Sequence, residues 1–129
     1  MKREVAAEVM DMVRDAVHEM KARMRLDLRN SRKASRTDEA KLIGALLAAI
    51  DNAEAPPIRA DAESKDRHSF FERSSEIERL TLDPEQLHAI LLTEIQERDI
   101  AADEMERVGR PDLGERLRAD ALFAKRYIE

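Results

Sequence analysis

Residues 82–128 constrain the fold of this chain more than any other stretch, because they contain the signals for two helices and for the turn between them. Asp83 is a favourable N-cap, and Pro84 is a favourable first helical residue because its missing N–H group needs no partner there. Gln86 completes the pattern of a capping box, in which two side chains and two backbone N–H groups bond reciprocally. A helix is therefore predicted from about residue 84 to residue 108.

Gly109 is placed to end this helix, since glycine readily adopts the positive φ that a helix C-terminus often requires. Arg110 follows, and Pro111 suits the first turn of a second helix over residues 111–128. So short a connection makes neighbouring helices antiparallel. Apolar residues recur at helical spacing on both sides of the turn: Leu87, Leu91, Ile95, Ala102 and Met105 before it, and Leu113, Leu117, Ala121, Ala124 and Ile128 after it.

The composition of the whole chain favours the same class of fold. Charged residues make up 40% of the 129 residues and aromatic residues only 3%, with 3 Gly and 4 Pro, which is a composition rich in helix formers. A chain of this length suits one domain with one core. We predict an all-α fold, a small helical bundle, with a helix pair in residues 1–55, a connector in residues 56–81 and an antiparallel helical hairpin in residues 82–129.

Two helices are predicted in the first half of the chain, over residues 3–28 and 38–54, with a break at Asn30 and Ser31. Thr37 is the expected N-cap of the second helix, which is apolar nearly all round and therefore belongs in the middle of the fold. Pro56 and Pro57 end it, and residues 56–80 lack a clear period, so we expect a mobile or only briefly helical connector. The methionines of the first helix favour core packing, with an adaptable binding groove as the alternative: Met10, Met12, Met20 and Met24.

Lysine and arginine are concentrated in residues 21–36, where Asp27 is the only acidic residue, although the net charge of the chain is −5. Such a stretch predicts either a surface that contacts nucleic-acid phosphates or a solvated helix end, whose cations complement the helix dipole. The candidate nucleic-acid-binding residues are Arg23, Arg25, Arg29, Arg32, Lys33 and Arg36. Arg98 falls on an apolar stripe, so it either pairs with an acidic residue across the hairpin, which we favour, or binds an anion.

No catalytic residue, cofactor or metal site is predicted. The chain has no Cys, which excludes a disulfide, a thiolate zinc site and a thiol nucleophile. The pairs Asp15/His18 and Glu85/His88 have the spacing of carboxylate-bridged metal sites, but we interpret these histidines as surface residues because the pairs do not face a core. No apolar run is long enough for a signal peptide or a membrane span, so we expect a cytoplasmic protein without a membrane partner.

Two segments of the chain resemble the GatB/YqeY domain family. The residues that carry the resemblance are Glu94-Ile95-x-x-Arg98, Glu104-x-Glu106-Arg107-Val108-Gly109-Arg110-Pro111-Asp112-Leu113, Arg116-Leu117-Arg118-Ala119 and Tyr127-Ile128 in the second half, and Arg32-Lys33-Ala34 and Leu46-Leu47-Ala48-Ala49-Ile50-Asp51-Asn52-Ala53-Glu54 in the first half. We assign structural roles to five residues of the second half of the chain: Asp83, Arg98, Gly109, Arg110 and Pro111.

The resemblance implies an all-helical, stand-alone protein similar to the tail region of the GatB component of the tRNA-dependent amidotransferase. That tail is similar to a tRNA-contacting appendage, and longer family members continue into a small C-terminal helical domain, whereas this chain ends at Glu129. The leading hypothesis is a non-catalytic accessory module with tRNA or amidotransferase subunits as partners. Two alternatives stay open: a carbon-nitrogen ligase with glutamine as amido-N-donor, by family association, and a module that binds a protein partner.

Overall fold

The structure, a computed structural model, describes residues 2–56 and 79–129, and for most of residues 2–15 it describes the backbone alone. The described residues form four α-helices and no strand: α1 (Lys2–Lys33), α2 (Thr37–Glu54), α4 (Pro84–Arg107) and α5 (Pro111–Ala124), followed by the 3-10 turn η2 (Lys125–Tyr127). The predicted all-α helical bundle is confirmed. Most of the expected connector, residues 57–78, lies outside the described residues.

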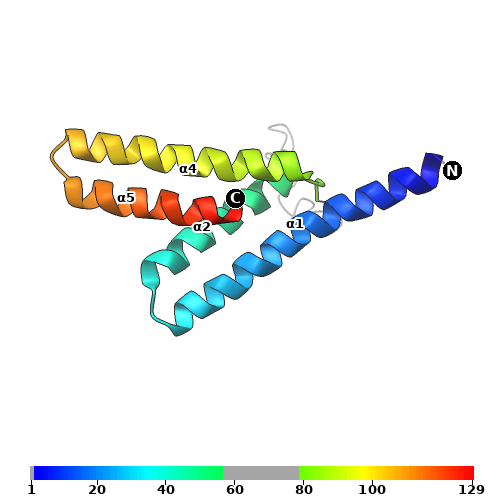
Figure 1. The fold of residues 1–129 in the computed structure, drawn as a ribbon, viewed down its shortest axis with the longest axis horizontal. Helices are drawn as coiled ribbons and strands as arrows, with labels where there is room; N and C mark the ends of the chain where they lie inside the picture. Colours follow the sequence, from blue (N-terminus) through cyan, green and yellow to red (C-terminus); the bar gives the residue numbers. More distant parts are fainter. Residues whose placement is uncertain (1, 57–78) are drawn as a thin grey trace, which may run out of the picture.

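The helices are arranged as two pairs (Figure 1). α1 packs against α2, and α4 packs along α5 in the opposite direction, with residues 108–110 joining the second pair. α2 contacts α1, α4 and α5, so it connects the two pairs. The N-terminal part of α1 extends beyond the other helices.

A hydrophobic cluster of described residues holds the two pairs together. α2 contributes Ile43, Leu46 and Ile50, whose spacing places them on one side of the helix, and each of them is fully buried. Met24 of α1 and Leu91 of α4 are buried against the same cluster. α2 lies in the middle of the fold, as expected, although its far side, which carries two alanines at positions 45 and 48, is exposed.

Only part of the methionine series in α1 belongs to this core. Met24 is fully buried and Met20 packs against the cluster, as the core interpretation predicts. Met12 is 70% exposed, and the Met10 side chain lies outside the described residues. The core interpretation therefore holds for the second half of α1.

α4 begins with the capping box that the sequence predicts. The backbone N–H of Gln86 donates to the Asp83 carboxylate over 2.7 Å, and the backbone N–H of Asp83 donates to Gln86 Oε1 over 2.9 Å. Pro84 is the first helical residue. Leu82 and Leu87, on either side of the cap, are both buried. The reciprocal bonds and the apolar contacts together set where the chain enters the helix.

The turn between α4 and α5 has Gly109 at φ 80°, as predicted. The Gly109 N–H donates to the carbonyl of Glu106 over 3.2 Å, and the Arg110 N–H donates to the carbonyl of Met105 over 2.7 Å. These two bonds form the Schellman pattern, which satisfies carbonyl groups at a helix end. Pro111 then opens α5, and Arg110 Nε lies 3.5 Å from the Asp112 carboxylate.

We expect Gly109→Ala to lower the free energy of unfolding by about 1 kcal/mol, because a Cβ atom is strained at positive φ. The added methyl group would meet no other atom within 4 Å, so the effect is one of backbone conformation alone. Chemical denaturation measures the change. An unchanged midpoint would show that residue 109 does not adopt the left-handed conformation.

The predicted break at Asn30 and Ser31 is wrong, since α1 continues to Lys33. Ser31 is only 2% exposed, and its hydroxyl donates to the Glu39 carboxylate of α2 over 3.1 Å. Because the neighbouring helix supplies this partner, the serine does not have to bond to its own backbone and end the helix. Thr37 is the first residue of α2 and not its N-cap, which is Arg36 without a side-chain cap bond.

α1 ends in the same hydrogen-bonded turn as α4. The Arg36 N–H donates to the carbonyl of Ser31 over 2.8 Å, and the Ser35 N–H donates to the carbonyl of Arg32 over 3.2 Å. The residue at the left-handed position is Ser35, with φ 59°. Serine therefore occupies here the position that glycine occupies after α4.

Candidate nucleic-acid interface

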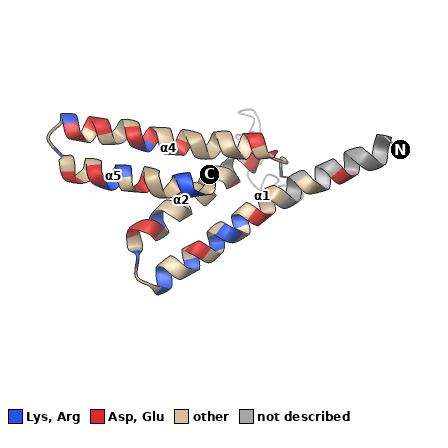
Figure 2. Ribbon diagram, viewed as in Figure 1, with Lys and Arg blue, Asp and Glu red and all other residues tan. Residues whose placement is uncertain are grey.

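Basic residues gather along the second half of α1 and at the turn into α2 (Figure 2). Arg25, Arg29 and Arg32 are spaced by four and three residues, which places them on one side of the helix, and Lys33 lies beside them. All four side chains are exposed. Along the helix axis, Arg25 and Arg29 stand about 6 Å apart, and Arg29 and Arg32 about 4.5 Å apart. We call these four residues the basic stripe.

The basic stripe is not neutralised by acidic side chains in the part of the chain that the structure describes. None of its four residues forms an ion pair with another described residue. Asp27, the only acidic residue in positions 21–36, faces the opposite side of α1, where it accepts a hydrogen bond from the Tyr127 hydroxyl over 2.6 Å. The stripe therefore presents a local positive field on an acidic protein.

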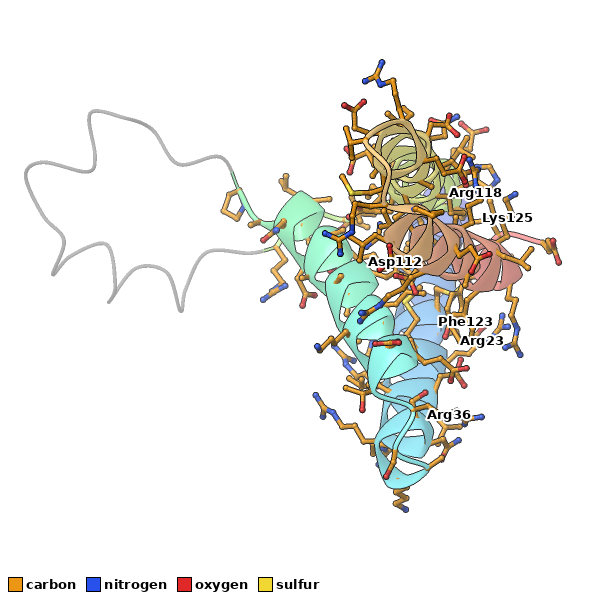
Figure 3. All side chains as sticks on the ribbon, turned by 90° about the vertical axis from the view of Figure 1, so that its left-hand side faces the viewer. Arg23, Arg36, Asp112, Arg118, Phe123 and Lys125 are labelled. Carbon is orange, nitrogen blue, oxygen red and sulfur yellow. The ribbon has the colours of Figure 1, made fainter. Side chains whose placement is uncertain are left out.

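The other two predicted nucleic-acid-binding residues, Arg23 and Arg36, make contacts within the protein. The Arg23 guanidinium, which is labelled in Figure 3, lies over the Tyr127 ring, 5.0 Å from its centroid. Arg36 Nε lies 3.1 Å from the Glu39 carboxylate, at the turn between α1 and α2. Neither residue is part of the basic stripe.

Lys21, at the start of the basic stretch, is a structural residue. It is buried, and its Nζ atom lies 3.2 Å from the Asp51 carboxylate and pairs with the Glu54 carboxylate as well. Both carboxylates belong to α2. The ammonium group therefore ties α1 to α2.

A pocket of about 490 Å³ opens where α1 passes into α2. We call it the turn pocket, and its lining residues are Ser31, Arg32, Ser35, Thr37, Ala40, Lys41 and Gly44. It adjoins the basic stripe through Arg32, which belongs to both. The sequence-based prediction missed Lys41, although this lysine is an isolated cation four residues after Thr37 and hence on the same side of α2.

Arg98 is paired within its own helix and not across the hairpin. Its Nη1 atom donates to the Glu94 carbonyl over 2.8 Å and lies 3.3 Å from the Glu94 carboxylate. Across the hairpin, burial raises the pKa of Asp120, while Arg98 and Arg116 act in the opposite direction. The groove of about 410 Å³ around Arg98 is lined by more carboxylates than cations. This arrangement favours the structural interpretation of Arg98 over anion binding.

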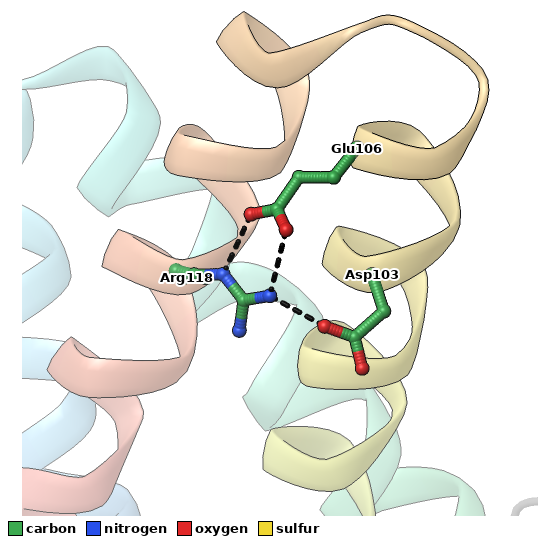
Figure 4. A network of polar contacts seen from close by, with 3 residues as sticks. All are labelled: Asp103, Glu106 and Arg118. Carbon is green, nitrogen blue, oxygen red and sulfur yellow. Dashed lines mark hydrogen bonds and ion pairs between the residues drawn. The ribbon is translucent and has the colours of Figure 1, made fainter.

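Arg118 links the two helices of the second pair (Figure 4). From α5, its guanidinium bonds to the carboxylates of Glu106 and Asp103 on α4, with 3.0 Å between Arg118 Nε and Glu106 Oε1. These hydrogen bonds raise the pKa of Arg118 above its already high value. At the turn, the hydrogen bond from Arg110 is the largest of the causes that lower the pKa of Asp112. The charged side chains described here, at the end of the second helix pair that carries the turn, are thus paired with one another.

Among the described residues, no group of three or more His, Asp or Glu side chains is placed to hold a metal ion. None of the helices described combines the length and the hydropathy needed to cross a membrane. Comparison with known proteins adds no assignment, since no protein-family model, curated protein or solved structure matches the chain.

Proposed function

We propose that this chain is a non-catalytic, cytoplasmic accessory module that binds structured RNA through the basic stripe. The observation that carries the proposal is the set of four exposed cations on one side of α1, without an acidic partner among the described residues. A chain with a net charge of −5 has no general attraction for polyanions, so its RNA contacts concentrate where the local charge is positive.

The resemblance to the GatB/YqeY domain family supports tRNA as the RNA and subunits of the tRNA-dependent amidotransferase as associated proteins. In this role the module would supply contacts to the RNA backbone, and the amide chemistry would take place on another protein. Arginine and lysine at successive turns of a helix suit this role because phosphate contacts position an RNA without reading its bases.

Binding to bulk tRNA is expected to weaken steeply as salt is raised. Each phosphate contact releases condensed counterion, and for single-stranded nucleic acid the slope of log K against log salt is roughly −0.7 per contact. Four contacts from the basic stripe therefore give a slope of about −3. A fluorescence titration with bulk tRNA at several salt concentrations, with duplex DNA of equal phosphate concentration in parallel, measures this slope.

Changing Arg29, Arg32 and Lys33 together to Glu is expected to abolish tRNA binding at moderate salt. The helical circular-dichroism signal should stay unchanged, because exposed charges contribute little to folding. The matched control changes Arg107, Arg110 and Arg126 to Glu, which alters the net charge by the same amount at three exposed positions outside the stripe. This control variant should retain most of the affinity of wild type for tRNA.

Two outcomes would overturn the proposal. One is a wild-type chain without salt-sensitive affinity for RNA. The other is a stripe variant that binds tRNA as well as the control variant does. Either result would identify the basic stripe as a solvated helix end and would favour the module that binds a protein partner.

A further inference from the structure

The turn pocket combines room for a small anion with positive charge on two of its walls. Its volume of about 490 Å³ lies within the range of small-ligand sites. Arg32 of α1 and Lys41 of α2 are among its lining residues, and neither forms an ion pair with another described residue. Ser35 and Thr37 add two exposed hydroxyl groups. No carboxylate is among the lining residues.

The two carboxylates nearest in sequence to the pocket are bound elsewhere. Asp38 pairs with Arg116 of α5. Glu39 accepts a hydrogen bond from the Ser31 hydroxyl and lies 3.1 Å from Arg36 Nε. Neither carboxylate lines the turn pocket, and Lys41 lines both this pocket and the groove around Arg98. Arg32 and Lys41 are therefore the charged residues of the turn pocket.

No contact with the described residues requires glycine at position 44. Glycine inside a helix is less stabilising than alanine, and a Cβ atom added at position 44 would meet nothing within 4 Å. Gly114 of α5 differs, because a Cβ atom there would lie 3.1 Å from the carbonyl oxygen of Ala102. Gly44 thus leaves an open stretch of helix surface on the wall of the pocket, as expected where a ligand approaches the backbone closely.

The backbone conformation of Ser35 is also unfavourable for a residue other than glycine. Its φ of 59° is strained for a residue with a Cβ atom, whereas Gly109 takes the corresponding position after α4 without strain. Ser35 is one of the residues that line the turn pocket. Position 35 therefore carries a hydrogen-bonding group where the backbone alone would favour glycine.

From these observations we infer that the turn pocket binds one backbone phosphate of the RNA, between Arg32 and Lys41 and within reach of the Ser35 and Thr37 hydroxyls. The inference rests on the proposed function and adds a defined subsite to it. Neighbouring phosphates of the same strand lie along Arg25 and Arg29, since Arg32 belongs both to the pocket and to the basic stripe. Gly44 leaves the space in which the phosphate and its ribose approach α2.

Two variants test the subsite without touching the basic stripe. Lys41→Gln removes one phosphate contact, so the slope of log K against log salt should become less steep by roughly 0.7. Gly44→Leu keeps every charge and fills the pocket, and it should weaken tRNA binding about tenfold, the typical loss for one charged contact of this kind. The double variant, with both Lys41→Gln and Gly44→Leu, should have the same affinity for tRNA as the single variant that binds tRNA less tightly, because both changes remove the same contact.

Ala48→Leu is the matched control for Gly44→Leu. It adds the same side chain to an exposed position one turn further along α2, outside the pocket lining, and should leave the affinity unchanged. Circular dichroism and thermal unfolding verify that each variant is folded. If Gly44→Leu fails to fold, the change in salt slope of Lys41→Gln still decides the outcome.

The possible results separate the subsite from the proposed function. One result is that Lys41→Gln and Gly44→Leu bind tRNA as wild type does, while the triple variant of the basic stripe does not bind. This result refutes the subsite but supports RNA binding by the basic stripe. A wild-type chain without RNA affinity refutes both. Inorganic phosphate is a second probe: if it binds wild type but not Lys41→Gln and leaves the affinity for tRNA unchanged, the pocket belongs to a free phosphate and the inference is overturned.

Discussion

Leu46→Ala is expected to lower the free energy of unfolding by about 2–5 kcal/mol. Leu46 is fully buried on α2, the helix that contacts α1, α4 and α5. Truncation would therefore open a cavity where the two helix pairs meet, and none of the surrounding helices can move into it without losing contacts elsewhere. A loss of this size is a large part of the stability of an ordinary domain of this length.

Leu122→Ala provides the matched control, because it is the same chemical change at a residue that is 68% exposed. It should change the free energy of unfolding by no more than about 0.5 kcal/mol. Urea denaturation of wild type and both variants gives the comparison. Equal losses in the two variants would contradict a core centred on α2.

Tyr127→Phe is expected to lower the free energy of unfolding by about 2 kcal/mol, the typical effect of a hydrogen bond to a charged group. Tyr127 is 4% exposed, and its hydroxyl donates to the Asp27 carboxylate over 2.6 Å. The variant keeps the ring, and hence the edge contact with Phe123 and the stacking of Arg23, but leaves the carboxylate without its donor. Denaturation at neutral pH measures the loss.

The same tyrosine makes stability depend on alkaline pH. Burial raises the pKa of Tyr127, and the hydrogen bond to Asp27 acts in the same direction. The unfolded chain ionises near pH 10, whereas the folded chain keeps the proton, so the unfolded state binds fewer protons above that pH. Stability contributed by Tyr127 is therefore complete below pH 10 and falls as the pH rises above it.

The chain contains one tyrosine and no tryptophan, so the absorbance of tyrosinate reports on Tyr127 alone. In the folded protein this absorbance should appear only as the protein unfolds, well above the pH at which it appears in urea. Tyr127→Phe should lose the part of the alkaline stability change that this group causes. A phenol that titrates near pH 10 in the folded state would contradict the assignment.

The elements that could be predicted from the sequence are those whose causes are local. Asp83, Pro84 and Gln86 define the start of α4 within four residues of chain, and Gly109 defines its end through the φ value that only glycine adopts easily. The end of α1 is not predictable in this way, because Ser31 is a weak helix breaker whose hydroxyl finds its partner on α2. Such a partner is visible only when the helices have been packed.

The candidate site was predictable to a similar degree. The spacing of Arg25, Arg29 and Arg32 follows from the sequence once α1 continues past residue 30. The sequence does not show that Arg23 stacks on Tyr127, since the two residues are far apart in the chain. Nor does it show that Lys41 and Arg32 line the same pocket, because that depends on how α1 and α2 cross.

The contact between Tyr127 and Asp27 also has a consequence for the order of folding. Each helix pair, α1 with α2 and α4 with α5, consists of neighbours in sequence, so each can form early from short-range contacts. The bond between Tyr127 and Asp27 joins residues 100 positions apart. During synthesis α1 and α2 leave the ribosome before α4 and α5, and they expose the apolar side of α2 until those helices pack against it, so aggregation competes with folding during this period.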